Sequence, residues 1–190
     1  MRDIIILGCG PTCADCKYDT EVWGVNSVAA WNERLDKLFF FDDLEAFNPM
    51  VMTIADVANS YNRGVELVTT QKNAEYCRGL HIPTTIYPLS EIVAEYHTAY
   101  FANSIAYMLA YAMREKADKV KLYGIDHLTF QTYILERACL EYWLGRMVER
   151  GIEVEIASGS ALLKTGDGKL YGYDHFFNTA ASSLDRVIVA

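Results

Sequence analysis

The chain has 190 residues, a length that suits one domain, and 52% of them are hydrophobic, which is enough for a sizeable core. Its formal net charge is −8 at pH 7, so a broad nucleic-acid surface of clustered lysines and arginines is not expected. No apolar run approaches the roughly 20 residues that a membrane-spanning helix requires.

The N-terminus passes from Met1 and Arg2 straight into an apolar segment, so no secretory signal is visible. The five cysteines are an odd number, and without a secretory signal they indicate reduced thiols. We therefore expect a cytoplasmic protein that acts on a small molecule.

In chain order, short apolar segments that predict strands alternate with segments that predict helices. The first segment, Arg2–Leu7, is continuously apolar, which is typical of a strand covered on both faces. The predicted strands cover residues 2–7, 21–25, 37–41, 65–69, 84–87, 119–123 and 152–156. Helical stretches are expected over residues 44–60, 90–96, 104–116 and 132–150, the last of them ended by Gly151.

This alternation predicts an α/β fold of the Rossmann-like kind, a mostly parallel twisted sheet with helices on both faces. We assign residues 1–173 to a single Rossmann-like nucleotide-binding domain. The tail over residues 174–190 fits two interpretations, either a helix with a final strand or an arm that contacts another subunit of a homo-oligomer.

In an open parallel sheet, ligands bind beyond the carboxyl ends of the strands. The first such loop is a turn of sequence Gly-Cys-Gly-Pro-Thr at positions 8–12, whose backbone N–H groups we expect to bind a phosphate. The alternative is a tight turn without a ligand, since the third glycine of the dinucleotide motif is absent. Asn26 and Ser27 follow the second strand, where Asn26 either bonds a ribose or phosphate or caps a helix.

Four polar residues near the last two strands are candidate catalytic groups. Asp126 either orients a sugar hydroxyl or caps a helix, and His127 is a candidate general base or a surface residue. Tyr133 and Glu136 lie three residues apart and face one side of a helix, where they either frame a pocket or start a solvated helix. Arg137 is a further candidate for pairing with a ligand phosphate.

Two patterns suggest metals. The spacing Cys9-x3-Cys13-x2-Cys16 is that of radical-SAM enzymes, which hold an iron–sulfur cluster with three thiolates; a zinc site and free thiols are the alternatives. Asp42 and Asp43 follow the third strand and are candidate ligands for Mg²⁺.

Taken together, several segments resemble the bacterial α-2,3-sialyltransferases of glycosyltransferase family 42. The turn at 8–12 stands where that family has Gly-Asn-Gly-Pro-Ser, and Trp23–Asn26 stands where it has a strand ending in Cys-Asn. The firmest match runs from Asn103 to Asp126, where the family has a Thr-Ser-Gly turn, a buried helix containing Tyr-Met and a strand ending in Gly-Ile-Asp. The resemblance covers roughly two thirds of the chain and extends to the related phage and archaeal group that includes the MptE-like pterin pyrophosphokinases.

The resemblance implies a nucleotide or nucleotide sugar, with a CMP type favoured, held by the loops at the strand ends. The expected nucleotide-binding residues are Gly8, Cys9, Gly10, Pro11, Thr12, Asn26, Ser27, Asn103, Ser104 and Gly124. Gln131 stands near the position of the family's histidine base and cannot act as a base. Either His127 or Tyr133 then substitutes for that histidine, or the reaction differs.

Three functions follow from these patterns. The first is a transferase that moves a glycosyl group, or a diphosphate group with Mg²⁺, from a nucleotide-bound donor to an acceptor. The second is a protein that binds or sequesters a nucleotide without catalysis, as a phage protein would do. The third is an iron–sulfur enzyme built on the three N-terminal cysteines.

Overall fold

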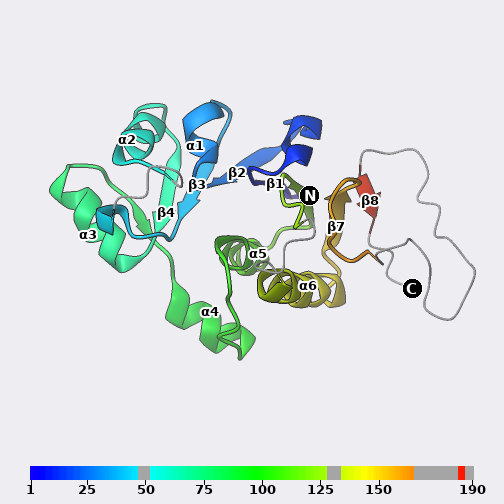
Figure 1. Ribbon diagram of the computed structural model, residues 1–190. Coiled ribbons are helices and arrows are strands. Elements are labelled where there is room, and N and C mark those ends of the chain that lie inside the picture. The colour runs from blue at the N-terminus through cyan, green and yellow to red at the C-terminus, as the bar shows by residue number, and fades with distance from the viewer. Residues whose placement is uncertain (47–51, 128–133, 165–183, 187–190) are drawn as a thin grey trace, which may run out of the picture.

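The structure is a computed structural model that describes residues 1–46, 52–127, 134–164 and 184–186 of the chain. Its centre is one twisted sheet with the strand order β5-β4-β3-β2-β1-β6-β7-β8 (Figure 1). The first seven strands pair in parallel, and β8 pairs antiparallel with β7. The predicted Rossmann-like α/β class is confirmed.

The strand positions agree with the apolar segments of the sequence. The strands are β1 Asp3–Leu7, β2 Glu21–Val25, β3 Lys37–Phe40, β4 Glu66–Thr69, β5 Thr85–Ile86, β6 Lys119–Tyr123, β7 Glu153–Ala157 and β8 Leu184–Arg186. In β1 the four residues Ile4–Leu7 are fully buried, because strands pair on both sides and side chains pack on both faces. β8 lies within the predicted C-terminal tail and extends the same sheet.

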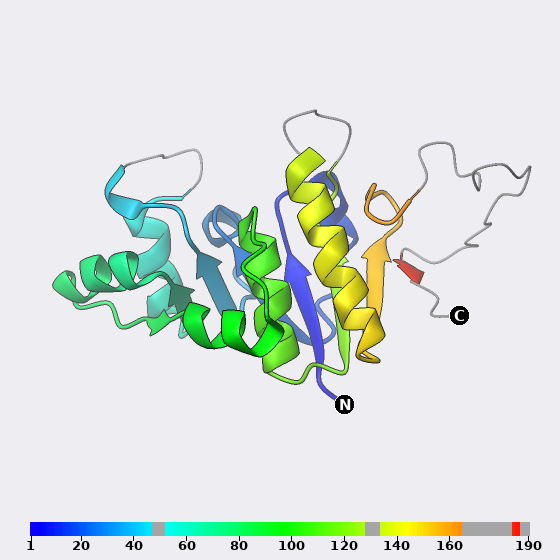
Figure 2. The same cartoon turned by 90° about the horizontal axis from the view of Figure 1, so that it is seen from below.

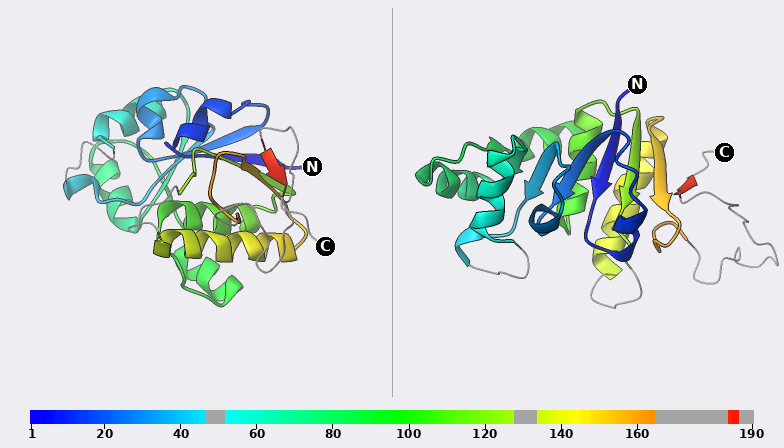
Figure 3. Two further views of the ribbon diagram at one scale, coloured as in Figure 1. Left: turned by 45° about the vertical axis from the view of Figure 1, so that its right-hand side comes forward. Right: turned by 90° about the horizontal axis from the view of Figure 1, so that it is seen from above.

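Helices lie on both faces of the sheet (Figures 1 and 2). They are α1 Val28–Trp31, α2 Ile54–Asn62, α3 Gln71–Gly79, α4 Leu89–Tyr96, α5 Ser104–Arg114 and α6 Ile134–Glu149, with short 3-10 turns η1 Pro11–Asp15 and η2 Leu44–Ala46. α1 and α2 pack together on one face, and α5 packs with α4 and α6 on the other. Figure 3 shows these two layers from two further sides.

The central helix is α5, as its apolar composition predicts. Eight of its eleven residues are buried, and it packs against β1 and β3. The Tyr111 ring lies 5.7 Å from the Trp23 ring and 5.4 Å from the Phe39 ring, both in edge-on geometry. These contacts fix the N-terminus of α5 beyond the carboxyl ends of the strands. No helix among the described residues is long and apolar enough to span a membrane.

One helix of the structure, α3, is absent from the sequence prediction. α3 was not predicted, because its residues are mostly polar and give no apolar periodicity. Its start has a sequence signal, since the Thr70 side chain accepts a hydrogen bond from the Asn73 N–H at 3.2 Å. The stretch 44–60, predicted to hold one or two helices, contains η2 and α2. The connection from β1 to β2, for which no helix is predicted, contains η1.

Two leucines of α6 provide a matched test of the packing. Leu140 is fully buried, whereas Leu135 is 74% exposed. We expect Leu140→Ala to lower the free energy of unfolding by about 2–5 kcal/mol, because it removes buried methyl groups and leaves a cavity. Leu135→Ala should change it by less than about 0.5 kcal/mol. Urea denaturation measures both, and equal losses would contradict the packing of α6.

Candidate functional site

The parallel strands end at one edge of the sheet, and their arrowheads point the same way in Figure 2. At this edge the loops after β6, β1, β2, β3, β4 and β5 follow one another in the order of the strands. The chain order reverses between β1 and β6, so this pair is the topological switch point of the sheet. The sequence predicted a ligand site at this edge.

At the switch point, the loops after β1 and β6 pack against each other through glycines. A Cβ atom on Gly8 would lie 2.4 Å from the Gly124 carbonyl oxygen, and a Cβ on Gly124 would lie 2.3 Å from the Gly8 oxygen. A Cβ on Gly10 would lie 2.5 Å from the Asp126 carboxylate. Gly124 also has a φ of +66°, which favours glycine. These glycines therefore permit the close approach of two loops.

Thr12 and Asp126 join the two loops by hydrogen bonds in buried surroundings. The Thr12 N–H donates to the Asp126 carboxylate at 2.9 Å, and the Thr12 hydroxyl donates to its other oxygen. The Gly124 N–H donates to the Thr12 hydroxyl oxygen at 2.8 Å, and the Gly10 N–H donates to the Gly124 carbonyl at 2.8 Å. We therefore assign to Asp126 the role of holding the two loops together.

This arrangement differs from the phosphate turn that the sequence suggests. The N–H groups of Gly8, Gly10 and Thr12 donate to protein acceptors, and Pro11 has none. The turn also leads into the five-residue η1 and not into an α-helix whose dipole would favour an anion. Cys9 is exposed at the tip of the turn, and its Sγ lies 3.0 Å from the Ser27 Oγ.

Asn26 lies at this edge, after β2, and has a buried acceptor without a donor among the described residues. It has a left-handed φ of 47°, a conformation that asparagine tolerates better than most residues. Its Nδ2 donates to the Asp42 carboxylate at 2.8 Å and so joins the ends of β2 and β3. Its Oδ1 is buried and accepts no hydrogen bond from the described residues. A buried acceptor of this kind favours a ligand that brings an N–H donor.

The N-terminus of α5 supplies backbone donors to the same edge. Asn103 caps the helix, and its Oδ1 accepts from the Ala106 N–H at 2.9 Å. The Asn103 Nδ2 lies 3.5 Å from a carboxylate oxygen of Glu136 at the start of α6. Ser104 is the first residue of this eleven-residue helix, whose dipole favours negative charge at this end.

His127 is the described candidate for a general base. It follows the Gly124–Asp126 loop with a left-handed φ of 43°. Burial lowers the pKa of its imidazole, while the nearby Glu136 carboxylate raises it by a smaller amount and Arg137 lowers it. The net shift of the pKa is downward from 6.5, so at pH 7 the imidazole is uncharged and can accept a proton. Tyr133 and Gln131 lie outside the described residues.

The metal hypotheses find little support in the described part of the chain. No group of three or more His, Cys, Asp and Glu side chains in it is arranged to hold a metal ion. Burial raises the pKa values of the Cys13 and Cys16 thiols, which opposes the thiolate form that iron or zinc requires. Asp43 pairs with Lys72 at 2.5 Å, while Asp42 bonds Asn26. These described donors therefore do not fit an iron–sulfur cluster or Mg²⁺.

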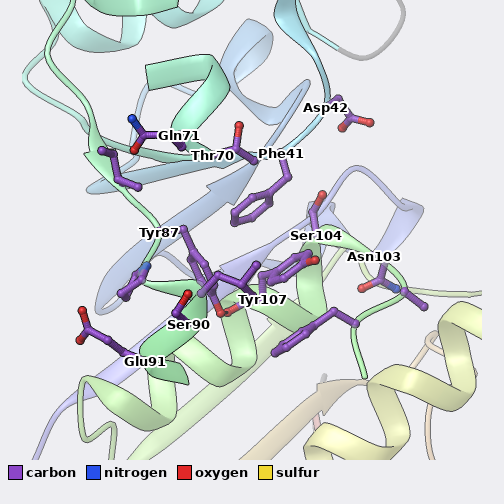
Figure 4. A pocket seen from close by; sticks show the side chains of 15 residues that line it. Phe41, Asp42, Thr70, Gln71, Tyr87, Ser90, Glu91, Asn103, Ser104 and Tyr107 are labelled. Atoms are coloured by element: carbon purple, nitrogen blue, oxygen red, sulfur yellow. Dashed lines mark hydrogen bonds between the residues drawn. The ribbon is translucent and has the colours of Figure 1, made fainter. Parts of the chain in front are cut away.

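A cavity of about 680 Å³ opens beside the loop after β3 and the start of α5 (Figure 4). It includes Asp42, Asn103 and Ser104, which the sequence singled out. Its aromatic floor was missed by sequence reasoning; it consists of Phe41, Tyr87, Phe101 and Tyr107. Phe41 was placed in the third predicted strand, but β3 ends at Phe40. The one indication of this floor in the sequence is an aromatic residue, Phe41, directly before Asp42.

Several solved structures have the same fold. The sialyltransferase CstII from Campylobacter jejuni in complex with cytidine-5′-monophosphate matches with a TM-score of 0.53 and 18% identity, over 82% of this chain and 79% of that one. The complex of CstII with CMP-3FNeuAc matches with a TM-score of 0.53 and 16% identity, over 82% of this chain and 80% of that one. A complex of CST-II with a trisaccharide acceptor and CMP matches with a TM-score of 0.53 and 15% identity, over 82% of this chain and 80% of that one. At these identities the likeness establishes the fold. No protein-family model and no curated protein matches the chain.

The contact between the two glycine loops gives a first prediction for the site. In Gly124→Ala the new methyl group meets the Gly8 backbone and the residue keeps a positive φ. We expect a loss of about 2–5 kcal/mol in the free energy of unfolding, from backbone strain and overpacking together. Thermal or urea denaturation measures the loss.

The matched control is Gly145→Ala in the exposed face of α6, where a Cβ meets nothing within 4 Å. This variant should gain about 0.5–1 kcal/mol, because alanine favours a helix interior over glycine. A Gly124→Ala protein as stable as the parent chain would show that the two loops do not pack this closely.

Proposed function

We propose that this protein is a glycosyltransferase-like enzyme that binds a CMP-sugar at the carboxyl edge of its sheet and transfers the sugar to an acceptor. The observation that carries the proposal is the buried Oδ1 of Asn26, which lacks a donor among the described residues. Cytosine carries an exocyclic amine that can donate to such an oxygen, whereas uracil has a carbonyl in that place. The Asn26 side chain is already oriented by its bond to Asp42.

The phosphate of the nucleotide is assigned to the N-terminus of α5. The described loops at this edge offer few other donors, because the turn at 8–12 uses most of its N–H groups in contacts with the β6 loop. The Asn103 side chain occupies the Ala106 N–H, which leaves the N–H groups of Ser104 and Ile105 for an anion. The helix dipole stabilises the negative charge that grows on the phosphate as the sugar leaves.

His127 is assigned the role of general base. It removes the proton of the acceptor hydroxyl as the hydroxyl oxygen bonds to the sugar carbon, and the bond from that carbon to the phosphate oxygen breaks. Its low pKa keeps the imidazole neutral before the reaction. Glu136, whose charge raises that pKa, stabilises the imidazolium that forms. The similarity in fold to sialyltransferase structures that hold CMP and CMP-3FNeuAc supports a CMP-sugar as the donor.

The preference for cytosine over uracil is tested with Asn26→Gly. This change removes the side chain, and glycine tolerates the left-handed φ of this position. We expect the parent protein to bind CMP about tenfold or more tightly than UMP, and Asn26→Gly to lose this preference, because a hydrogen bond to a buried acceptor is missing. Isothermal titration calorimetry measures the affinities of the parent protein and of Asn26→Gly for CMP and for UMP.

His97→Gly is the control, since His97 also has a positive φ, 51°, but is exposed at the C-terminal end of α4. It should leave both affinities unchanged. Equal binding of CMP and UMP by the parent protein would refute the role of Asn26, and no binding of either would refute the proposed function.

The catalytic role of His127 predicts a pH dependence. A base with a pKa below 6.5 must be deprotonated, so kcat should rise with pH through that pKa and level off above it. His127→Asn should lower kcat by about 100-fold to 10,000-fold and abolish this rise. The assay follows CMP release from CMP-N-acetylneuraminic acid with lactose as acceptor. If the protein binds CMP tightly but releases no CMP from the donor, the result favours the second function, nucleotide binding without catalysis.

A further inference from the structure

The segment of residues 97–103 joins α4 to α5 and ends at Asn103, the residue that caps the proposed phosphate site. A short-range bond shapes its middle, where the Tyr100 N–H donates to the Thr98 hydroxyl oxygen at 3.2 Å. A bond of this kind bends the chain but does not fix the segment relative to the sheet. The position of the cap therefore depends on contacts with another element.

That element is α6, which lies beside α5 (Figure 1) and contacts the segment through the thiol of Cys139. The Cys139 thiol donates to the Tyr100 carbonyl at 3.3 Å, and its sulfur accepts from the Ala102 N–H at 3.3 Å. Cys139 is fully buried, so water does not compete for either bond. Burial also raises the pKa of this thiol, which therefore stays protonated and able to donate at neutral pH.

Two further side chains of α6 hold the earlier part of the same stretch. The Trp143 Nε1–H donates to the Tyr100 carbonyl at 2.8 Å, and the Trp143 ring stacks on the Phe101 ring with centroids 4.9 Å apart. The Arg146 guanidinium donates to the carbonyl of Tyr96, the last residue of α4, at 2.8 Å. These contacts fix the end of α4 and the middle of the segment against α6.

We propose that Cys139 is a positioning residue for the phosphate site and acts through the backbone of Ala102. The next two residues are Asn103, whose side chain caps α5, and Ser104, whose N–H is assigned to the phosphate. Without the thiol, the residue directly before the cap loses its bond to α6. N–H groups that are not already aimed at the phosphate must be ordered on binding, which costs affinity. The role in phosphate binding rests on the proposed function, whereas the hold on the cap rests on the hydrogen bonds alone.

Three cysteine variants separate this role from packing alone. Cys139→Ala removes both hydrogen bonds, whereas Cys139→Ser keeps a group that can donate and accept. Cys77→Ala is the matched control, because Cys77 is also fully buried in a helix and its thiol has no hydrogen-bond partner among the described residues. Each alanine variant removes one buried sulfur atom, and thermal denaturation confirms that all three proteins fold.

Isothermal titration calorimetry with CMP and with cytidine, which lacks only the phosphate, measures the effect on phosphate binding. The ratio of the cytidine dissociation constant to the CMP dissociation constant reports what the phosphate adds. We expect Cys139→Ala to lower this ratio about tenfold while the affinity for cytidine stays the same. Cys139→Ser should keep the ratio within about threefold of the parent value, and Cys77→Ala should leave it unchanged.

Amide hydrogen exchange, followed by NMR without ligand, tests the hold on the cap directly. The Ala106 N–H donates to the Asn103 Oδ1 at 2.9 Å, so its exchange rate reports whether the cap stays in place. Cys139→Ala should raise this rate about tenfold, because the cap opens more often when the bonds to α6 are lost. Cys139→Ser and Cys77→Ala should exchange close to the parent rate.

The proposal is overturned if Cys139→Ala keeps the parent ratio, if it weakens CMP and cytidine equally, or if Cys77→Ala lowers the ratio as much. It is also overturned if Cys139→Ser behaves like Cys139→Ala, because the hydrogen bonds are then not the cause, or if the parent protein binds CMP no better than cytidine. If the parent binds neither compound, the proposed function fails, and the exchange rate of Ala106 alone decides whether Cys139 positions the cap. An unchanged rate in Cys139→Ala overturns that role, and a raised rate supports it.

Discussion

The site depends on the contact between the loops after β1 and β6. The two backbones approach so closely that a Cβ atom on either Gly8 or Gly124 would overlap the other loop. Thr12 and Asp126 fasten this contact with hydrogen bonds away from water. Because these loops are joined to each other, they form a rigid base, and the groups left for a ligand lie farther along the edge at Asn26, Asp42 and the start of α5.

This division of roles explains what could be predicted from the sequence. The continuous apolar run of Arg2–Leu7 and the apolar helix after Ser104 identify the fold, because burial on both faces leaves a clear pattern. The sequence also places the ligand edge, since the carboxyl ends of parallel strands meet there. It assigns the glycine turn to phosphate binding, however, because a turn that approaches a phosphate and a turn that approaches another loop need the same residues.

The rest of the site depends on contacts between distant segments. The side-chain bond of Asn26 is set by Asp42, and the floor of the cavity joins Phe41 from the end of β3 to Tyr107 of α5. Neither pairing leaves a periodic signal in the sequence. The lowered pKa of His127 likewise follows mainly from burial in the folded protein, which its neighbours in the chain do not reveal. Only the folded arrangement separates a candidate base from a surface histidine.

The join between Thr12 and Asp126 also constrains how the protein is made. The two residues are separated by 114 positions, so the N-terminal turn emerges from the ribosome long before its partner. The strands β1 to β5 can pair one after another as they appear, but the edge that holds Asn26 and Asp42 lacks its base until β6 is inserted beside β1. Contacts of such high sequence separation form late and slowly. The protein should therefore gain its ligand-binding edge near the end of folding, in the step that completes the sheet.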